Sequence, residues 1–237
     1  MSADKETRMN EWFVPKFGPV RFRVFVGLLF LPYTGMCVSF AIIGSMLAGE
    51  IAWDRVGAIV LIYTFALGIS AHVADSLGSK KIKPWGSYFT KVQLLTIMIA
   101  TLTAAYAIGL YYIVFFVPLL AVIALLEGFF LFTYNYELWD GLFHNDFWFA
   151  VSWGSLPLLA GYIIQTNSIS ILALSVACLT GLASYAEIRM SRPYKQLKQR
   201  NDDASARTKR LEDGLKAISV STIIFSLSML AYRIIFS

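Results

Sequence analysis

Residues 24–47, "VFVGLLFLPYTGMCVSFAIIGSML", form an apolar run without a charged side chain. Such a run is long enough to cross the roughly 30 Å hydrocarbon layer of a bilayer as a helix. Similar runs recur along the chain of 237 residues, of which 57% are hydrophobic and only 15% are charged. Soluble domains carry about 25% charged residues. The sequence therefore predicts an all-α polytopic membrane protein.

Seven membrane spans are predicted, and they lie at residues 24–47, 56–74, 90–111, 115–134, 147–164, 168–187 and 217–236. We expect one transmembrane domain over residues 24–237, preceded by a cytoplasmic or interfacial arm over residues 1–23. Cytoplasmic loops are expected near residues 75–89, 135–146 and 188–216.

The basic residues predict the orientation of these spans. They are concentrated in the N-terminal arm, in the loop after the second span and in the segment before the last span. Seven spans leave only Arg55 and Arg233 on the opposite side. The positive-inside rule then predicts a cytoplasmic N-terminus and a multi-pass protein of the cell membrane. The net charge of +5 fits this topology and attraction to anionic membrane lipids, so it does not indicate a nucleic-acid partner.

A polar cluster lies at the end of the second predicted span, in "AHVADSLGS" (residues 71–79). His72 precedes Asp75 by three positions, and Ser79 follows Asp75 by four. On a helix, these spacings place the three side chains on one face. Ionisable groups within or at the ends of spans are costly, and by default they suggest a functional site.

The end of the sixth span repeats this spacing in "ASYAEIRMSRPYK" (residues 183–195), where Ser184, Glu187 and Ser191 lie three and four positions apart. Both clusters are followed by basic residues, which are Lys80, Lys81 and Lys83 after the first and Arg189, Arg192 and Lys195 after the second.

Two interpretations of the paired clusters remain open. If the two helix ends face each other, Asp75 and Glu187 could share a divalent cation, and the basic residues could hold a phosphate. Alternatively, snorkelling and the positive-inside bias produce an acid followed by basic residues without any ligand.

Two further groups of polar residues in the sequence also have two possible interpretations each. Glu127 is the only acid placed well inside a span, and it is either a hydrogen-bonded residue of a packed interface or a substrate contact. Gly128 beside it would allow close helix approach. In the loop at residues 135–146, His144 and Asp146 either contact a ligand or cap the fifth span and solvate the loop.

Four stretches occur in an order that is typical of one family of membrane enzymes. They are "RFRVFVGLLFLPYTGMCVSFAIIGSMLAG" (residues 21–49), "AHVADSLGSKKIKP" (residues 71–84), "WGSLPLLAGY" (residues 153–162) and "ASYAEIRMSRPYK" (residues 183–195). In their order, spacing and topology, they resemble the first helix, the first aspartate-rich motif, a Gly-Ala-x-Pro-x-x-x-Gly segment and the second aspartate-rich motif of the UbiA superfamily of intramembrane prenyltransferases.

The resemblance implies a UbiA-like helical bundle in which magnesium holds the diphosphate of an isoprenoid donor. The isoprenoid group would be transferred from that prenyl diphosphate to a lipophilic acceptor. On this alignment Asp75 and Glu187 are the metal ligands. The substrate-binding residues would be His72, Lys80, Lys81, Arg189, Arg192, Lys195 and Glu127.

The chain departs from the family pattern in ways that favour a second hypothesis. Ala71, His72 and Ser79 take positions of the first motif that are commonly asparagine or aspartate, and Ser184 and Ser191 replace acids of the second. The family usually has two more helices than are predicted here. The alternative is therefore a non-catalytic UbiA-fold protein that binds an isoprenoid lipid or quinone, or an accessory subunit of a membrane complex.

Two other classes of membrane protein are disfavoured by the sequence. A retinal protein needs a lysine near the middle of its last helix, and residues 217–236 contain none. A transporter would be expected to show inverted repeats or paired broken helices, and neither is evident.

Overall fold

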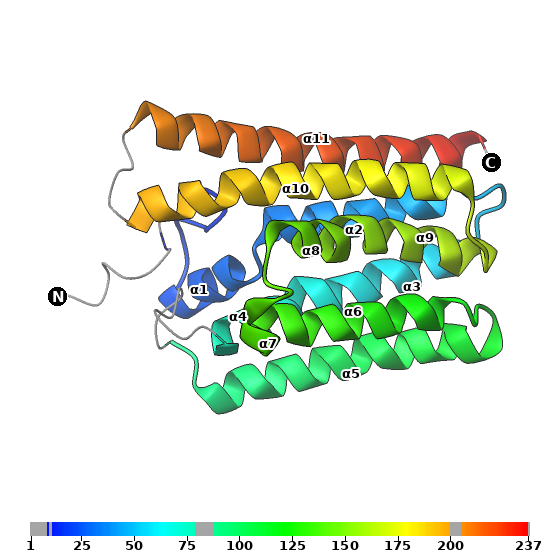
Figure 1. Cartoon of the computed structure of the whole chain (residues 1–237), viewed down its shortest axis with the longest axis horizontal. Coiled ribbons are helices and arrows are strands. Elements are labelled where there is room, and N and C mark those ends of the chain that lie inside the picture. Colours follow the sequence, from blue (N-terminus) through cyan, green and yellow to red (C-terminus); the bar gives the residue numbers. More distant parts are fainter. Residues whose placement is uncertain (1–8, 10, 79–87, 200–204, 237) are drawn as a thin grey trace.

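The structure is a computed structural model that describes residues 9, 11–78, 88–199 and 205–236. Every regular element in these ranges is helical, and the long helices run side by side as one elongated bundle (Figure 1). Six helical segments in these ranges are long and apolar enough to cross a membrane. The all-α polytopic membrane class predicted from the sequence is therefore confirmed.

The first two membrane-length segments are composite. The first consists of α1 (Val20–Leu28) and α2 (Leu31–Met46), and the second consists of α3 (Trp53–Tyr63), the π-helical turn η2 (Thr64–Ala71) and α4 (His72–Gly78).

The remaining elements follow in chain order. They are α5 (Lys91–Phe115), α6 (Leu120–Asn135), the short α7 (Leu138–Gly141), α8 (Asp146–Ala150), the π-helical turn η3 (Val151–Ser155), α9 (Leu156–Thr166), α10 (Ile171–Gln199) and α11 (Ala206–Phe236). The predicted fourth span corresponds to α6, which is apolar but shorter than the six membrane-length segments.

The first predicted span is not one straight helix. The chain breaks between α1 and α2, where Phe30 adopts a left-handed backbone conformation with φ 44°. Pro32 lies in the first turn of α2, where its missing N–H costs no hydrogen bond. Thr34 donates a hydrogen bond of 2.6 Å to the carbonyl of Leu29, so a carbonyl exposed by the break is satisfied. The break turns α1 away from α2 (Figure 1).

The segment predicted as a loop or surface helix at residues 188–216 is mostly helical. Helix α10 continues to Gln199, and α11 begins at Ala206. This segment is rich in Lys, Arg, Glu, Gln and Ala, which have high helix propensity even though they are not apolar. The pair between Lys216 and Glu212, at 2.6 Å and four positions apart, supports the same helix.

Helix α2 is the centre of the bundle, because twelve of its sixteen residues are buried. It packs against α9 almost backbone to backbone. A Cβ atom at Gly44 would meet the carbonyl oxygen of Leu158, and one at Gly161 would meet that of Ala41. Ser45 joins the two helices, since its hydroxyl donates to the carbonyl of Gly161 at 3.0 Å. Small residues permit this approach, as in other membrane helix pairs.

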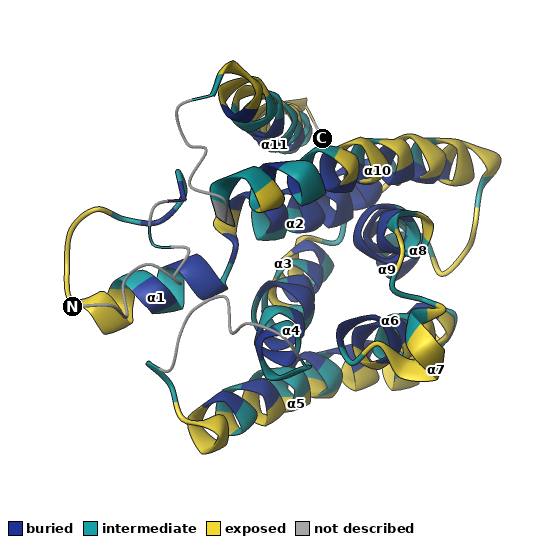
Figure 2. Ribbon diagram, turned by 60° about the vertical axis from the view of Figure 1, so that its left-hand side comes forward, coloured by how far each residue is buried: buried dark blue, intermediate teal, exposed yellow. Residues whose placement is uncertain are grey.

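Helix α11 lies at the edge of the bundle. Only 11% of its apolar stretch is buried, against 67% for the segment Asp146–Thr166. Figure 2 shows the same contrast, because buried positions face the middle of the bundle and the outward faces are exposed. A largely exposed apolar helix of this length is suited to contact with lipid.

The two basic residues expected on the non-cytoplasmic side both donate to backbone carbonyls of other segments. Arg55 donates to the carbonyl oxygens of Ile164 and Gln165 at 3.1 Å, and Arg233 donates to those of Ala48 and Gly49 at 2.7 Å. The last carbonyls of a helix lack partners within it, so Arg55 satisfies the end of α9. Arg233 satisfies two carbonyls of the loop that follows α2.

We expect Gly161→Ala to destabilise the protein by about 1–3 kcal/mol, because the new methyl group overpacks the contact with the α2 backbone. Gly57→Ala is the matched control, since a Cβ at Gly57 meets nothing within 4 Å and alanine favours a helix. Thermal unfolding in detergent should show a lower midpoint for the first variant only. Equal midpoints would contradict the backbone contact.

Candidate functional site

A cavity of about 210 Å³ lies at the end of the bundle where α4 ends and α8 begins. Asp75 of α4 and Glu187 of α10, which end the second and sixth predicted spans, both line it. His72, Arg192 and Lys195 line the same cavity. The structure therefore brings together five of the residues that the sequence singled out from two distant motifs.

Two π-helical turns position side chains of this cavity. The turn η2 ends at Ala71, directly before His72, and η3 contains Trp153. A π turn inserts extra backbone into a helix and is frequent at functional sites, because it rotates the residues that follow. Within η3, Gly154 lies so close to α10 that a Cβ would meet the carbonyl oxygen of Thr180. The turns thus set the direction in which His72 and Trp153 point.

Aromatic rings form one wall of the cavity. The ring of His72 stacks on Phe30 with centroids 4.9 Å apart, and it lies 5.0 Å from the ring of Trp153. Trp153 in turn stacks on Phe149 at 5.6 Å, with the rings nearly parallel at 10°. The ammonium of Lys195 lies 5.2 Å from the centroid of Phe30. This wall offers ring faces, which favour positive charge.

Glu187 is the most buried acid of the cavity, with 3% of its surface exposed. Its Oε1 atom is buried and has no hydrogen-bond partner among the residues that the structure describes. Buried polar atoms are nearly always paired, so such an oxygen suggests a missing ligand. One turn further along α10, Ser191 is already paired, because its hydroxyl lies 3.1 Å from that of Tyr33.

The basic side of the cavity is partly neutralised by Asp146. Its carboxylate lies 3.0 Å from Nε of Arg192 and 3.7 Å from Nη1 of Arg189. The Nη2 atom of Arg192 is buried without a hydrogen-bond partner in the described part of the chain. An anion that enters the cavity would bind the same guanidinium group as Asp146, so the two would compete for Arg192.

The loop at residues 135–146 contributes more to the cavity than the sequence suggested. Asn145, rather than Asp146, caps α8 by accepting a hydrogen bond of 3.1 Å from the N–H of Trp148. His144 lines the cavity and stacks on Tyr134, with ring centroids 4.4 Å apart. His144 is therefore placed to contact a ligand, whereas Asn145 caps the helix. Asp146 pairs with Arg192.

Not all predicted site residues gather here. Arg189 does not line the cavity, and 63% of its side chain is exposed. Glu127 lines a separate cavity. Ser79, Lys80, Lys81 and Lys83 lie outside the described residues.

Sequence reasoning missed the aromatic wall of the cavity, which includes Phe30, Tyr33, Tyr134, Phe149 and Trp153. Aromatic residues occur in every predicted span, so composition does not distinguish those of the wall. The only local signal was their proximity to motifs already singled out, as with Trp153 at the start of "WGSLPLLAGY".

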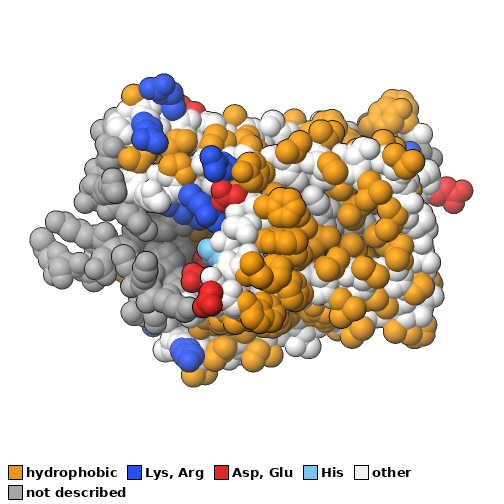
Figure 3. Space-filling view, viewed as in Figure 1, with side chains coloured by type: hydrophobic (Ala, Val, Ile, Leu, Met, Phe, Trp, Pro, Cys, Tyr) orange, Lys and Arg blue, Asp and Glu red, His pale blue; other side chains and the backbone are white. Residues whose placement is uncertain are grey.

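The surface of the molecule separates charge from apolar side chains. In Figure 3, basic and acidic side chains and a histidine gather around a hollow at the end that carries α4 and α7, whereas hydrophobic side chains cover the middle. A ligand with a charged head group and an apolar chain could place the head group in the hollow and the chain against the hydrophobic surface.

We expect Asp146→Asn to tighten the binding of inorganic diphosphate by up to about fivefold, because a partly exposed ion pair is worth up to about 1 kcal/mol. Arg192→Gln should weaken that binding. Asp140→Asn is the control for net charge, since Asp140 is exposed and has no ion pair in the described part of the chain. Isothermal titration calorimetry would measure the affinities, and equal values for the two aspartate variants would count against competition at Arg192.

Comparison of the chain with family models, with curated proteins and with solved structures finds no match. The resemblance to the UbiA superfamily therefore rests on the motifs of the sequence and stays a prediction.

Proposed function

We propose that the protein is a UbiA-like membrane prenyltransferase, which moves an isoprenoid group from a prenyl diphosphate to a lipophilic acceptor. The observation that carries this proposal is that Asp75 and Glu187 line one cavity together with two basic residues, Arg192 and Lys195. These are the residue types that a diphosphate and its counter-ion require. The donor chain would extend along the apolar interior of the bundle or into lipid.

The two acids fit a magnesium ion only together with the substrate. The described residues contain no group of three or more His, Cys, Asp or Glu that could hold a metal. Magnesium, however, is normally held by one or two carboxylates plus substrate phosphates and water. Asp75 and Glu187 would supply those carboxylates, and the unpaired Oε1 of Glu187 supports this role. When bound, the ion would neutralise charge on the diphosphate.

In the proposed reaction, the bond between the allylic carbon and the diphosphate oxygen breaks, and the electron pair leaves with the diphosphate. Arg192 and Lys195 would hold the departing diphosphate by charge-assisted hydrogen bonds. The ring faces of Phe30 and Trp153 would stabilise positive charge on the isoprenoid carbon. The acceptor forms the new bond to that carbon and releases a proton to solvent.

The test is an assay of diphosphate release from farnesyl and geranylgeranyl diphosphate by the purified protein, with and without magnesium. Asp75→Asn and Glu187→Gln should each reduce magnesium-dependent release by about 100-fold or more, the size of effect seen when charge stabilisation is lost at an active site. Asp140→Asn should retain it. Release that is unchanged in both acid variants would reject the assignment.

The second candidate is a non-catalytic protein that binds an isoprenoid lipid or quinone, and the presence of only two acids in the cavity favours it. Copurified lipid without diphosphate release, and without an effect of magnesium on thermal stability, would select this candidate. A membrane-complex partner recovered in gentle detergent would indicate the accessory-subunit form.

We also infer that α6 crosses the membrane with the six longer segments, so that the N-terminus and the cavity lie on the cytoplasmic side. The support is the charge distribution in the sequence and the position of α6 alongside α5 in Figure 1. Its 16 residues extend about 24 Å at 1.5 Å per residue, which is short but sufficient with its flanking turns.

This topology predicts the accessibility of two exposed positions. In a background in which Cys37 and Cys178 are replaced by alanine, Gly49→Cys should react with a membrane-impermeant maleimide in intact cells. Lys209→Cys should react only after permeabilisation. The reverse pattern would invert the topology, and labelling of both positions in intact cells would rule out the odd number of spans between them.

A further inference from the structure

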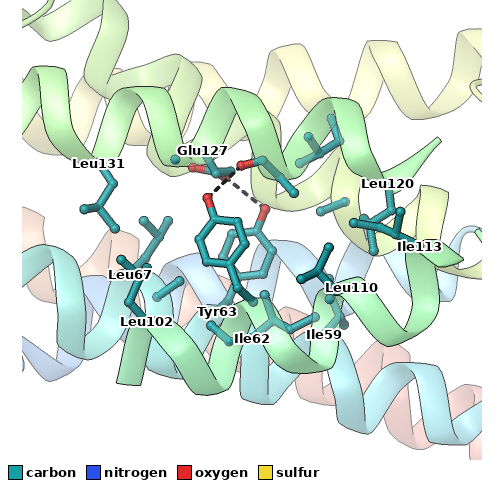
Figure 4. Close-up of a pocket in the computed structure, with 18 residues that line it drawn as sticks. Ile59, Ile62, Tyr63, Leu67, Leu102, Leu110, Ile113, Leu120, Glu127 and Leu131 are labelled. Atoms are coloured by element: carbon teal, nitrogen blue, oxygen red, sulfur yellow. Dashed lines mark hydrogen bonds between the residues drawn. The ribbon is translucent and has the colours of Figure 1, made fainter. Parts of the chain in front are cut away.

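A second cavity lies deeper in the bundle than the charged one, between the second membrane-length segment and helices α5 and α6 (Figure 4). Its volume is about 60 Å³, and none of its lining residues lines the charged cavity. Both cavities involve α6, where Glu127 and Tyr134 are about 10 Å apart along the helix at 1.5 Å per residue. The two sites are therefore separate places on one bundle.

The walls of this cavity are apolar, and its polar groups come from three residues. Tyr63 donates a hydrogen bond of 2.9 Å to Oε1 of Glu127, and Tyr106 donates one of 3.0 Å to the carbonyl of Ala124 (Figure 4). Gly128 makes room for Tyr106, because a Cβ there would meet the tyrosine hydroxyl. The hydrogen bond from Tyr63 and the packing of Tyr106 against Gly128 thus hold Glu127 between the two tyrosines.

The remaining hydrogen-bonding capacity of the cavity lies on the carboxyl group of Glu127. Both tyrosine hydroxyl hydrogens are already used, and Oε2 of Glu127 is buried without a partner among the described residues. An unpaired carboxyl oxygen in an apolar site is costly, so a ligand that forms a hydrogen bond with it would relieve that cost. A neutral hydroxyl group, which accepts from a protonated carboxyl and donates to an ionised one, suits the apolar walls better than a cation, which would have to lose its hydration.

The cavity is accessible from the side of the bundle. Leu110 lines it and is 53% exposed, on the surface where lipid would lie. A volume of about 60 Å³ suits a hydroxyl group with a few carbon atoms rather than a whole lipid. The rest of an apolar chain would have to extend past Leu110 into the bilayer.

We propose that this cavity is a second binding site, which takes the hydroxyl group of a lipophilic alcohol or phenol from the bilayer. The hydroxyl forms a hydrogen bond with Oε2 of Glu127 while Tyr63 donates to Oε1, and the apolar walls surround the first carbons of the ligand. This site does not depend on the prenyltransferase reaction, because it shares no lining residue with the charged cavity.

The test uses a photoreactive octanol that carries a diazirine, with the matching diazirine octane as the probe that lacks a hydroxyl. After irradiation of the purified protein, mass spectrometry should locate octanol labels in residues 102–131, where α5 and α6 line the cavity, and the octane should label this region at least several-fold less. Glu127→Leu should lose the hydroxyl-dependent labelling. Glu127→Gln should keep it, because the amide oxygen also accepts.

Glu187→Gln is the control in the other cavity, and it should leave this labelling intact even if it abolishes diphosphate release. Equal labelling by the two probes, or hydroxyl-dependent labelling that persists in Glu127→Leu, would overturn the proposal. If Glu127→Leu does not elute as a monodisperse peak, competition on the unmodified protein decides instead. Unlabelled 1-octanol should then suppress the labelling, and equal suppression by octane would overturn the proposal.

Discussion

The close contact between α2 and α9 is the constraint on which the arrangement of this bundle depends. Gly44 and Gly161 let the two backbones meet, and Ser45 adds a hydrogen bond between them. In a membrane, apolar side chains gain little by leaving lipid for a helix interface, so close packing and hydrogen bonds determine which helices associate. This contact fixes α2 at the centre and α9 beside it. The elements that enter the charged cavity, at Phe30 before α2 and Trp153 before α9, are positioned as a consequence.

Polar groups in the apolar part of the structure are used in a consistent way. Most bond to the backbone, as when Arg55 satisfies carbonyls at the end of α9 and Arg233 satisfies those of the loop after α2. Among the buried polar atoms that lack a partner in the described residues, two are carboxyl oxygens of acids that each line a cavity, Glu187 and Glu127. Because an unpaired polar atom is costly where water is absent, these two acids are the strongest indications of ligand sites in the described part of the chain.

The two cavities differ in the chemistry that they offer. The charged cavity presents acids, basic groups and ring faces near the end of the bundle, which suits a phosphorylated head group. The cavity around Glu127 presents one carboxyl group within apolar walls, which suits a neutral hydroxyl group that arrives through lipid. Helix α6 contributes to both, with Glu127 in one and Tyr134 in the other. The two cavities share no lining residue, so the ligands proposed for them would make separate contacts.

The sequence by itself determined the membrane class, the approximate location of the helices and the side on which basic residues collect, because hydropathy and charge bias are local properties of the chain. It also identified Asp75 and Glu187 as a pair from their matched spacing. It did not determine the break at Phe30, the helical extension of α10 and α11, the aromatic wall around His72 or the separation of Glu127 from the other candidates. Membrane helices are apolar on all sides, so their sequence does not encode which face turns inward. Only close packing and the π-helical turns η2 and η3 set those rotations, and they decide which polar side chains share a cavity.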